Sequence, residues 1–78
     1  MIHHVIIGER ALRQMRKTPP HVNAKLLAWA RAVQRVGLEV VRRIPGYHDE
    51  PLHGVREGQR SIRLNKAYRA IYVVRADG

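Results

Sequence analysis

The chain contains no cysteine among its 78 residues. No disulfide can therefore cross-link the fold, and no thiolate is available as a nucleophile or a metal ligand. Long apolar runs are missing as well, since stretches such as residues 5–7 and 26–30 are among the longest. A membrane span needs about 20 apolar residues and a secretory signal needs at least about seven. The sequence therefore predicts a soluble, cytoplasmic protein with no membrane partner.

Acidic residues are scarce, because six Asp and Glu stand against fifteen Lys and Arg, which gives a net charge of +9. Twelve of these fifteen are arginine, whose planar guanidinium grips phosphate with paired hydrogen bonds. A chain this basic calls for an anionic partner, which is a nucleic acid, an acidic protein or an anionic membrane surface. We favour nucleic acid over a membrane, with an ordinary solvated surface as the alternative. The length predicts a single domain over residues 1–78 with one modest core.

The N-terminal half predicts one strand and two helices. Residues Ile2–Ile7 are rich in β-branched side chains and end at Gly8, as an opening strand would. A short helix starts at Glu9, and Thr18 is placed to cap a second helix that runs from Pro20 to a stop at Gly37. The apolar residues of this second helix recur at spacings of three and four, which favours burial of its central tryptophan: Val22, Leu26, Trp29, Ala30, Val33 and Val36.

The C-terminal half predicts strands joined by short turns. Residues 38–44 favour a short helical turn, and residues 47–57 favour a polar loop with a brief strand. Apolar and polar residues alternate over Gln59–Leu64, and the turn Asn65-Lys66-Ala67 leads into a second long strand, Tyr68–Ala76. So short a turn makes the two strands antiparallel neighbours. The predicted class is α+β, with the helices on one side of a small antiparallel sheet.

Two arginines of this hairpin form a candidate anion site. Alternation places Arg60 and Arg63 on opposite faces of their strand, and a buried unpaired arginine would be costly. The cheaper arrangement puts Arg63 and Arg69 on an open face, close across the turn, where both reach one phosphodiester. The alternative is that both are ordinary solvated arginines of a strand.

Residues 48–74 read HDEPLHGVREGQRSIRLNKAYRAIYVV. This segment resembles the RelE/ParE superfamily of bacterial toxins, and most closely its RelE-, HigB- and YoeB-like branches. The resemblance covers about a third of the chain. It consists of a Glu-Pro-Leu loop, a strand led by glycine that reads Ser-x-Arg, and an aromatic-Arg pair before an apolar strand: Glu50-Pro51-Leu52, Gly58, Ser61-Ile62-Arg63 and Tyr68-Arg69.

The resemblance implies the toxin of a toxin–antitoxin system, a ribosome-dependent mRNA endonuclease that inhibits translation. Its partners would be the ribosome, mRNA and a cognate antitoxin, and it would use no cofactor and no metal. The 2′-hydroxyl of the RNA would attack the adjacent phosphorus, with Glu50 as general base, Arg69 as the main phosphate clamp and Arg63 as a second one. Five further side chains are expected to contact RNA or phosphate: Arg60, Arg56, His53, Lys66 and Tyr68.

Members of this family continue into one more strand and a tail that carries the general acid, whereas this sequence ends at Ala76-Asp77-Gly78. We therefore expect a domain that is truncated relative to the family and cleaves poorly. We also expect strand Tyr68–Ala76 to be covered by a second copy of the chain or by an antitoxin segment, because an apolar edge invites strand addition.

Two other functions stay open. A ParE-like toxin would inhibit DNA gyrase by protein contact, and a catalytically inactive remnant would only bind RNA or antitoxin. Metal binding is not expected, because His3 and His4 have no acidic residue at ligand spacing. No glycine-rich phosphate loop is present, and Ser61, the only serine, has no base placed to activate it. One run of basic residues on the first helix is a solvated or rRNA-facing surface: Arg10, Arg13, Arg16 and Lys17.

Overall fold

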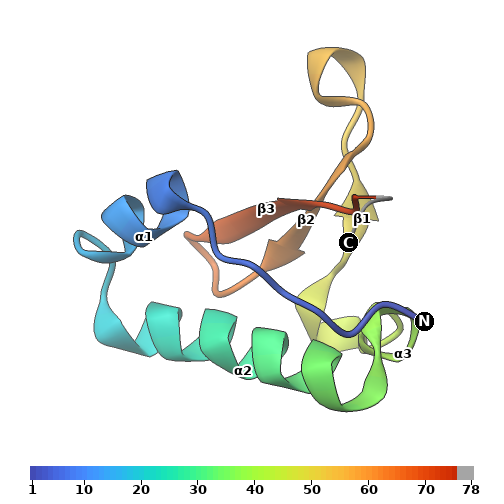
Figure 1. Cartoon of the computed structure of the whole chain (residues 1–78). Coiled ribbons are helices and arrows are strands. Elements are labelled where there is room, and N and C mark those ends of the chain that lie inside the picture. Colours follow the sequence, from blue (N-terminus) through green and yellow to red (C-terminus); the bar gives the residue numbers. More distant parts are fainter. Residues whose placement is uncertain (76–78) are drawn as a thin grey trace. The chain divides into compact units, whose positions relative to one another are not determined.

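The computed structural model describes residues 1–75 and contains three α-helices and a three-stranded antiparallel sheet (Figure 1). The predicted α+β class is confirmed. The chain divides into two compact units, Met1–Val41 and Arg42–Gly78. The first holds the α-helices and the second holds the sheet, and each is described by itself below.

The first unit is built on helix α2, Pro20–Val36. Its buried residues are Val22, Trp29, Ala30 and Val33, which lie on one face at the predicted spacing. Trp29 is 5% exposed, so its prediction as a core residue is confirmed. The helix ends at Gly37, whose φ of 93° lies in a region that L side chains rarely adopt. Helix α3, Leu38–Val41, follows at once, and helix α1, Glu9–Met15, precedes α2 and buries no residue.

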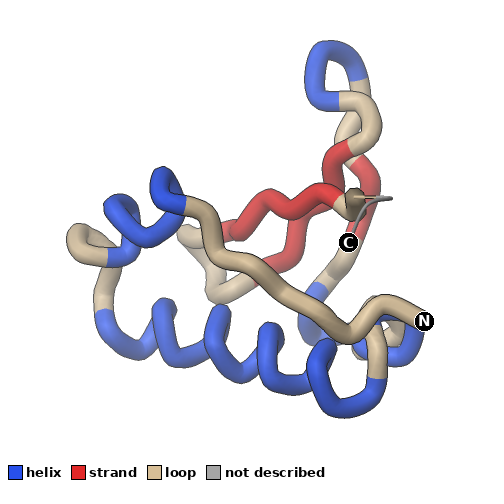
Figure 2. Tube along the Cα trace, in the orientation of Figure 1, coloured by secondary structure: helices blue, strands red, loops and turns tan. Residues whose placement is uncertain are grey.

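Two local predictions in this unit were wrong. Residues 1–8 form no strand, and Figure 2 draws them as loop. A strand needs a neighbouring strand to pair with its backbone N–H and C=O groups. Here the Ile2 carbonyl instead accepts a hydrogen bond, at 2.8 Å, from the N–H of Leu38 at the start of α3. Thr18 does not cap α2 either, because the N-cap is Pro19. The Thr18 hydroxyl instead donates to the Gln14 carbonyl at 2.8 Å, which closes the end of the preceding turn.

The second unit is a small sheet with strand order β1-β2-β3, in which both neighbouring pairs are antiparallel. Its strands are β1, Glu50–Pro51, β2, Gln59–Arg63, and β3, Arg69–Val73. The predicted loop with a brief strand and the predicted hairpin are therefore confirmed. Two short 3₁₀ helices complete the unit, η1 at Pro45–Tyr47 and η2 at Gly54–Arg56.

The turn between β2 and β3 is organised by the side chain of Asn65. Its Oδ1 accepts hydrogen bonds from the backbone N–H groups of Ala67, at 2.8 Å, and Tyr68, at 2.9 Å. Asparagine favours such turns because its side chain mimics a backbone carbonyl. This turn aligns β2 and β3 so that Arg63 lies directly opposite Arg69.

Strand β3 lies at one edge of the sheet, since among residues 1–75 it pairs with β2 alone. It is shorter than predicted, and Ala76 lies outside the described residues. Ile71 is 51% exposed and Val73 is 55% exposed, on the same face of β3. Self-association through this strand stays a prediction. No helix of residues 1–75 is long and apolar enough to cross a membrane.

Candidate functional site

One face of the sheet gathers the three residues expected to be catalytic. Glu50 on β1 lies opposite Ser61 on β2, and two residues further along β2, Arg63 lies opposite Arg69 on β3. Directly opposed residues point to the same side of a sheet. Glu50, Ser61, Arg63 and Arg69 therefore share one face, which we call the Glu50 face. The prediction that Arg63 and Arg69 lie close across the turn is confirmed.

The guanidinium of Arg69 is held along one of its edges. Its Nε and Nη2 both donate to the Ser61 hydroxyl, at 3.1 and 2.9 Å, and Nη2 also donates to the His48 carbonyl at 3.1 Å. The same Nη2 lies 3.1 Å from Glu50 Oε1, as an ion pair. Nη1 makes no hydrogen bond to the described part of the chain, and 39% of the side chain is exposed. One edge of the fork is thus fixed by protein and the other is open to a ligand.

Ser61 was not among the site residues expected from the sequence, yet it contacts Arg69 directly. The residue is 3% exposed, so its hydroxyl lies inside the sheet rather than on its surface. Its hydroxyl accepts both N–H groups of one edge of Arg69 and thereby fixes the plane of the guanidinium. We identify Ser61 as a positioning residue for Arg69. Its small size and its place two residues before Arg63 were the only signals in the sequence, because seven residues separate Ser61 from Arg69 along the chain.

Arg63 adds a second positive charge to the Glu50 face. It is half-buried and forms no ion pair with any residue of the described range. Like charges placed directly opposite one another on a sheet destabilise it. Glu50 offsets Arg69 but not Arg63, so the face keeps a surplus positive charge beside an open guanidinium edge. An anion bound there would relieve the repulsion.

The opposite face of the sheet carries a buried polar network. The Asp49 side chain is 0% exposed, and its Oδ1 lies 2.6 Å from Nε of Arg60. The Tyr72 hydroxyl donates to Oδ2 of the same carboxylate at 2.5 Å. Arg60 therefore lies away from Glu50, on the other side of β2, with its charge engaged by Asp49. The structure does not bring Arg60 to the residues expected to be catalytic, although it was expected among the phosphate contacts.

The network also shifts two ionisation equilibria. The hydrogen bond to Asp49 raises the pKa of Arg60 above its ordinary value, and burial acts in the opposite direction. Burial raises the pKa of Tyr72, and its hydrogen bond to Asp49 adds to that rise, whereas Arg42 lowers it. Both shifts keep the network in the state in which arginine is charged and tyrosine is neutral.

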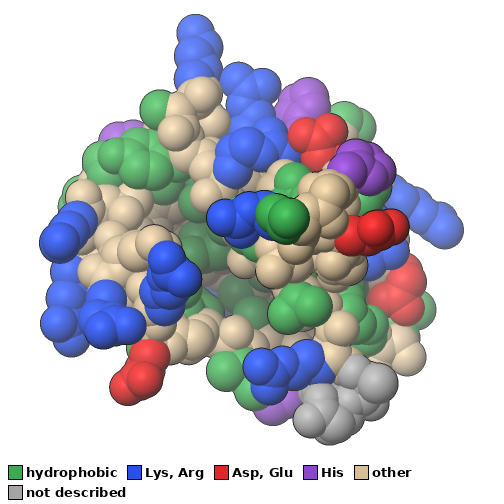
Figure 3. Space-filling view, turned by 90° about the horizontal axis from the view of Figure 1, so that it is seen from above, with side chains coloured by type: hydrophobic (Ala, Val, Ile, Leu, Met, Phe, Trp, Pro, Cys, Tyr) green, Lys and Arg blue, Asp and Glu red, His purple; other side chains and the backbone are tan. Residues whose placement is uncertain are grey.

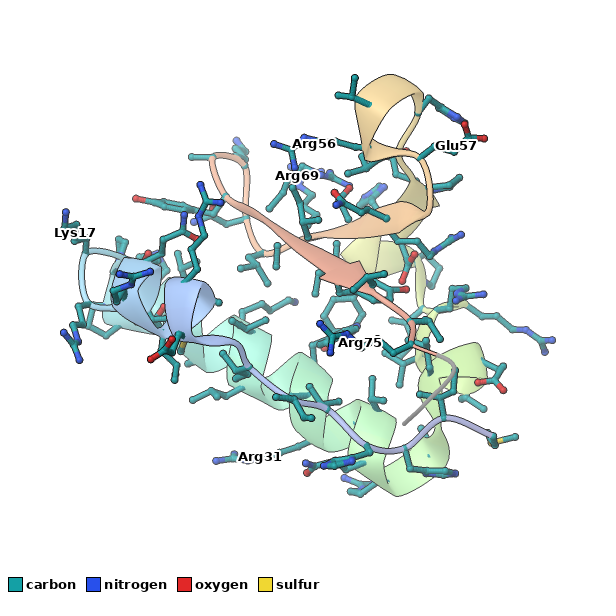
Figure 4. All side chains as sticks on the ribbon, turned by 45° about the horizontal axis from the view of Figure 1, so that its top comes forward. Lys17, Arg31, Arg56, Glu57, Arg69 and Arg75 are labelled. Carbon is teal, nitrogen blue, oxygen red and sulfur yellow. The ribbon has the colours of Figure 1, made fainter. Side chains whose placement is uncertain are left out.

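The remaining residues expected to contact RNA lie around the sheet rather than on the Glu50 face. Arg56, in η2, donates from Nη1 to the Gln59 side chain at 3.4 Å. His53 precedes η2 and is exposed, and Lys66 lies exposed in the β2–β3 turn. Tyr68 is 37% exposed and immediately precedes β3. Figure 4 shows Arg56 and Arg69 with Glu57 of the same unit.

His48 has a backbone conformation that is unusual for a residue other than glycine. Its φ is 45° and its ψ is 49°, in the left-handed region. Such residues cost energy and gather at functional sites. This conformation ends η1, and the His48 carbonyl, two residues before Glu50, accepts the hydrogen bond that Arg69 Nη2 donates. The strained turn therefore helps to place the Arg69 guanidinium beside the Glu50 carboxylate.

Among the charged side chains on the face shown in Figure 3, blue Lys and Arg cover more area than red Asp and Glu. The four basic residues of the N-terminal run are all exposed on or just after α1, as predicted: Arg10, Arg13, Arg16 and Lys17. In residues 1–75, no group of three or more His, Cys, Asp or Glu is placed to hold a metal ion.

Comparison of the chain with protein-family models, with curated proteins and with solved structures finds no match. The assignment of a function therefore rests on the geometry of the Glu50 face and on the segment of residues 48–74.

Proposed function

We propose that this chain is the RNA-cleaving toxin of a toxin–antitoxin pair, of the RelE-like kind, and that the Glu50 face is its active site. The observation that carries the proposal is one cluster: a carboxylate, Glu50, 3.1 Å from an arginine, Arg69, with a second arginine opposite it. The proposal includes a RelE-like packing of the helices on the sheet, ribosome-bound mRNA as substrate and an antitoxin as inhibitory partner.

The cluster supports cleavage by the 2′-hydroxyl of the RNA. The open Nη1 edge of Arg69, together with Arg63, binds the scissile phosphate and offsets charge that develops on the phosphorane. Glu50, whose side chain is 63% exposed, is accessible to an RNA strand and takes the proton of the attacking hydroxyl. A bound phosphate also competes with Glu50 for Arg69, which releases the carboxylate as the substrate arrives. The products are a 2′,3′-cyclic phosphate and a 5′-hydroxyl, whose proton comes from a third donor.

The test is cleavage of mRNA on translating ribosomes by the wild type and by Glu50→Gln, both extended by a family-like C-terminal strand and tail that supplies the general acid. We expect fragments ending in 2′,3′-cyclic phosphate from the wild type and a rate lower by about 100-fold from the variant. The rising limb of the pH–rate profile should flatten, because an amide has no proton to release or accept in that range. Glu39→Gln is the matched control, since Glu39 is an exposed acid of α3 that forms no ion pair with any described residue. Equal rates for wild type and Glu50→Gln would reject Glu50 as the base.

A gyrase supercoiling assay run in parallel with the cleavage assay distinguishes the ParE-like alternative from the nuclease proposal. Inhibition of supercoiling together with intact mRNA would reject the nuclease proposal. Activity in neither assay, with RNA still bound, would leave the inactive RNA-binding form as the function of this chain.

Association with ribosomes should weaken steeply as salt rises. Every phosphate that a basic side chain neutralises releases counterions, so the logarithm of affinity falls linearly with the logarithm of salt concentration. Co-sedimentation with ribosomes over a salt series measures the slope. Reversal of charge at Arg10, Arg13 and Arg16 should make the slope shallower if α1 faces rRNA, and an unchanged slope would confine the contact to the sheet. A salt-independent association would contradict binding through the basic surface.

A further inference from the structure

A cavity of about 330 Å³ lies in the second unit, at the end of the sheet where β1 leads into η2 and β2 begins. All of its lining residues belong to this unit. Its polar wall includes Arg42, His53 and Arg60, and its apolar wall includes Pro51, Leu52 and Val74. A volume of this size matches small-molecule sites, which begin at about 300 Å³.

The cavity is separate from the Glu50 face. Arg60 and Pro51 are opposite one another in the register of β1 and β2, one residue from Ser61 and Glu50 respectively. Successive residues of a strand point to opposite sides. Arg60 and Pro51 therefore line the cavity from the face that Glu50 and Ser61 do not occupy.

Hydrogen-bond donors outnumber acceptors in the polar wall. The Nε of Arg42 is buried and has no hydrogen-bond partner among the described residues. Arg60 carries five N–H donors, yet the carboxylate that pairs with it, Asp49, also accepts the Tyr72 hydroxyl. The Asp49 carboxylate is thus shared by Arg60 and Tyr72, while the cavity wall contains two guanidinium groups, those of Arg42 and Arg60. A ligand rich in anionic acceptors would match this surplus of guanidinium donors in the wall.

We propose that this cavity binds a nucleotide, with its phosphate at Arg42, Arg60 and His53. Guanidinium groups bind phosphate oxygens in pairs, and a low-dielectric wall strengthens that attraction. Inorganic phosphate alone would leave the apolar wall empty, whereas a ribose and base fill it against Pro51, Leu52 and Val74. The nucleotide is either a free mononucleotide or a residue of an RNA strand. The second source rests on the proposed function, and the two-residue strand β1 at the sheet edge is short enough for RNA to pass around.

One acidic residue, Glu57, also lines the cavity and opposes an anion there. It is exposed at the end of η2 and forms no ion pair with the described residues, so water screens its charge (Figure 4). Glu57 therefore provides a test of whether the ligand is negatively charged. Removal of the Glu57 charge should tighten phosphate binding without disturbing the core.

The experiment is calorimetric and NMR titration of the purified chain with 5′-AMP, adenosine and inorganic phosphate at low ionic strength. We expect 5′-AMP to bind at least roughly ten-fold more tightly than either fragment, since each fragment fills one wall only. Arg42→Gln should weaken 5′-AMP binding by roughly ten-fold or more, and Glu57→Gln should strengthen it a few-fold. Arg43→Gln is the control, because Arg43 is exposed and does not line the cavity.

The gain expected from Glu57→Gln cannot arise from misfolding, so the proposal stays falsifiable if Arg42→Gln unfolds. No binding of 5′-AMP at millimolar concentration would overturn the proposal. Equal weakening by Arg42→Gln and Arg43→Gln, or weaker binding to Glu57→Gln, would also overturn it. Displacement of 5′-AMP by a short single-stranded RNA identifies RNA as the source, and persistence of 5′-AMP in the presence of that RNA identifies a free nucleotide.

Binding is measured without ribosomes, so its outcome is independent of cleavage. Binding of 5′-AMP by a chain that cleaves no mRNA would retain the cavity as a nucleotide site and reject the proposed function. Cleavage of mRNA by a chain that does not bind 5′-AMP would retain the proposed function and reject the cavity as a nucleotide site.

Discussion

Arg69→Ala, in a chain extended by the family-like C-terminal strand and tail, is expected to lower the rate of mRNA cleavage by roughly 100- to 1000-fold, because it removes the group that offsets charge on the phosphorane. The side chain is prepared for this role, since Ser61 and the His48 carbonyl fix one edge of the guanidinium and leave Nη1 open. Primer extension on translating ribosomes measures the rate. A loss in kcat rather than in KM would show that the contact strengthens in the transition state.

Arg69→Lys separates charge from geometry. Lysine keeps the positive charge but lacks the planar fork that Ser61 holds by two bonds, so we expect only part of the activity to return. Arg31→Ala is the control, because Arg31 is an exposed arginine of α2 (Figure 4). The ion pair between Arg69 and Glu50 is well exposed, so solvent screens it and its loss should hardly change stability. Full activity of Arg69→Ala, or equal loss in Arg31→Ala, would show that the site is misplaced.

Asp49→Ala is expected to cost about 3 kcal/mol of the free energy of unfolding, because it leaves a guanidinium and a phenol without their shared acceptor. The carboxylate is 0% exposed and Arg60 is 24% exposed, so solvent replaces the lost contacts only in part. A chain of this length is stable by roughly 4–12 kcal/mol in total. The variant should therefore melt on the order of 10–20 °C lower.

Thermal unfolding followed by circular dichroism measures this loss, with Glu39→Ala as the matched control. Glu39 is an exposed acid that forms no ion pair with residues 1–75. Equal melting temperatures for Asp49→Ala and the wild type would contradict the stabilising role of the network.

The free energy of unfolding at alkaline pH gives a second test of the network of Asp49, Arg60 and Tyr72. Burial and the bond to Asp49 raise the pKa of Tyr72 in the folded chain, so the fold favours the neutral phenol. The stability that this preference contributes is complete below the unfolded pKa, about 10, and is lost as pH rises through the higher folded value. Tyr72→Phe should therefore lose less stability than the wild type between about pH 9 and pH 12. A steeper loss in the variant would contradict the assignment.

The sequence by itself determined the features that depend on local periodicity. Helix α2 follows from apolar residues at spacings of three and four, and the β2–β3 hairpin follows from alternation around Asn65. Because side chains alternate strictly along a strand, the same pattern placed Arg63 and Arg69 on one face and Arg60 on the other. The α+β class needs no more than these elements.

Only the tertiary structure decided which distant groups meet. Asp49 lies 11 residues from Arg60 and 23 from Tyr72, and no period in the sequence connects them. The hydrogen bonds between Ser61 and Arg69 likewise depend on the register of β2 and β3. The cavity lined by Arg60 depends on the register of β1 and β2 and on the course of the loop between them. The N-terminal segment shows the converse, since residues 2–7 have the composition of a strand and form none. Strand propensity is local, but a strand exists only when another segment of chain supplies its hydrogen bonds.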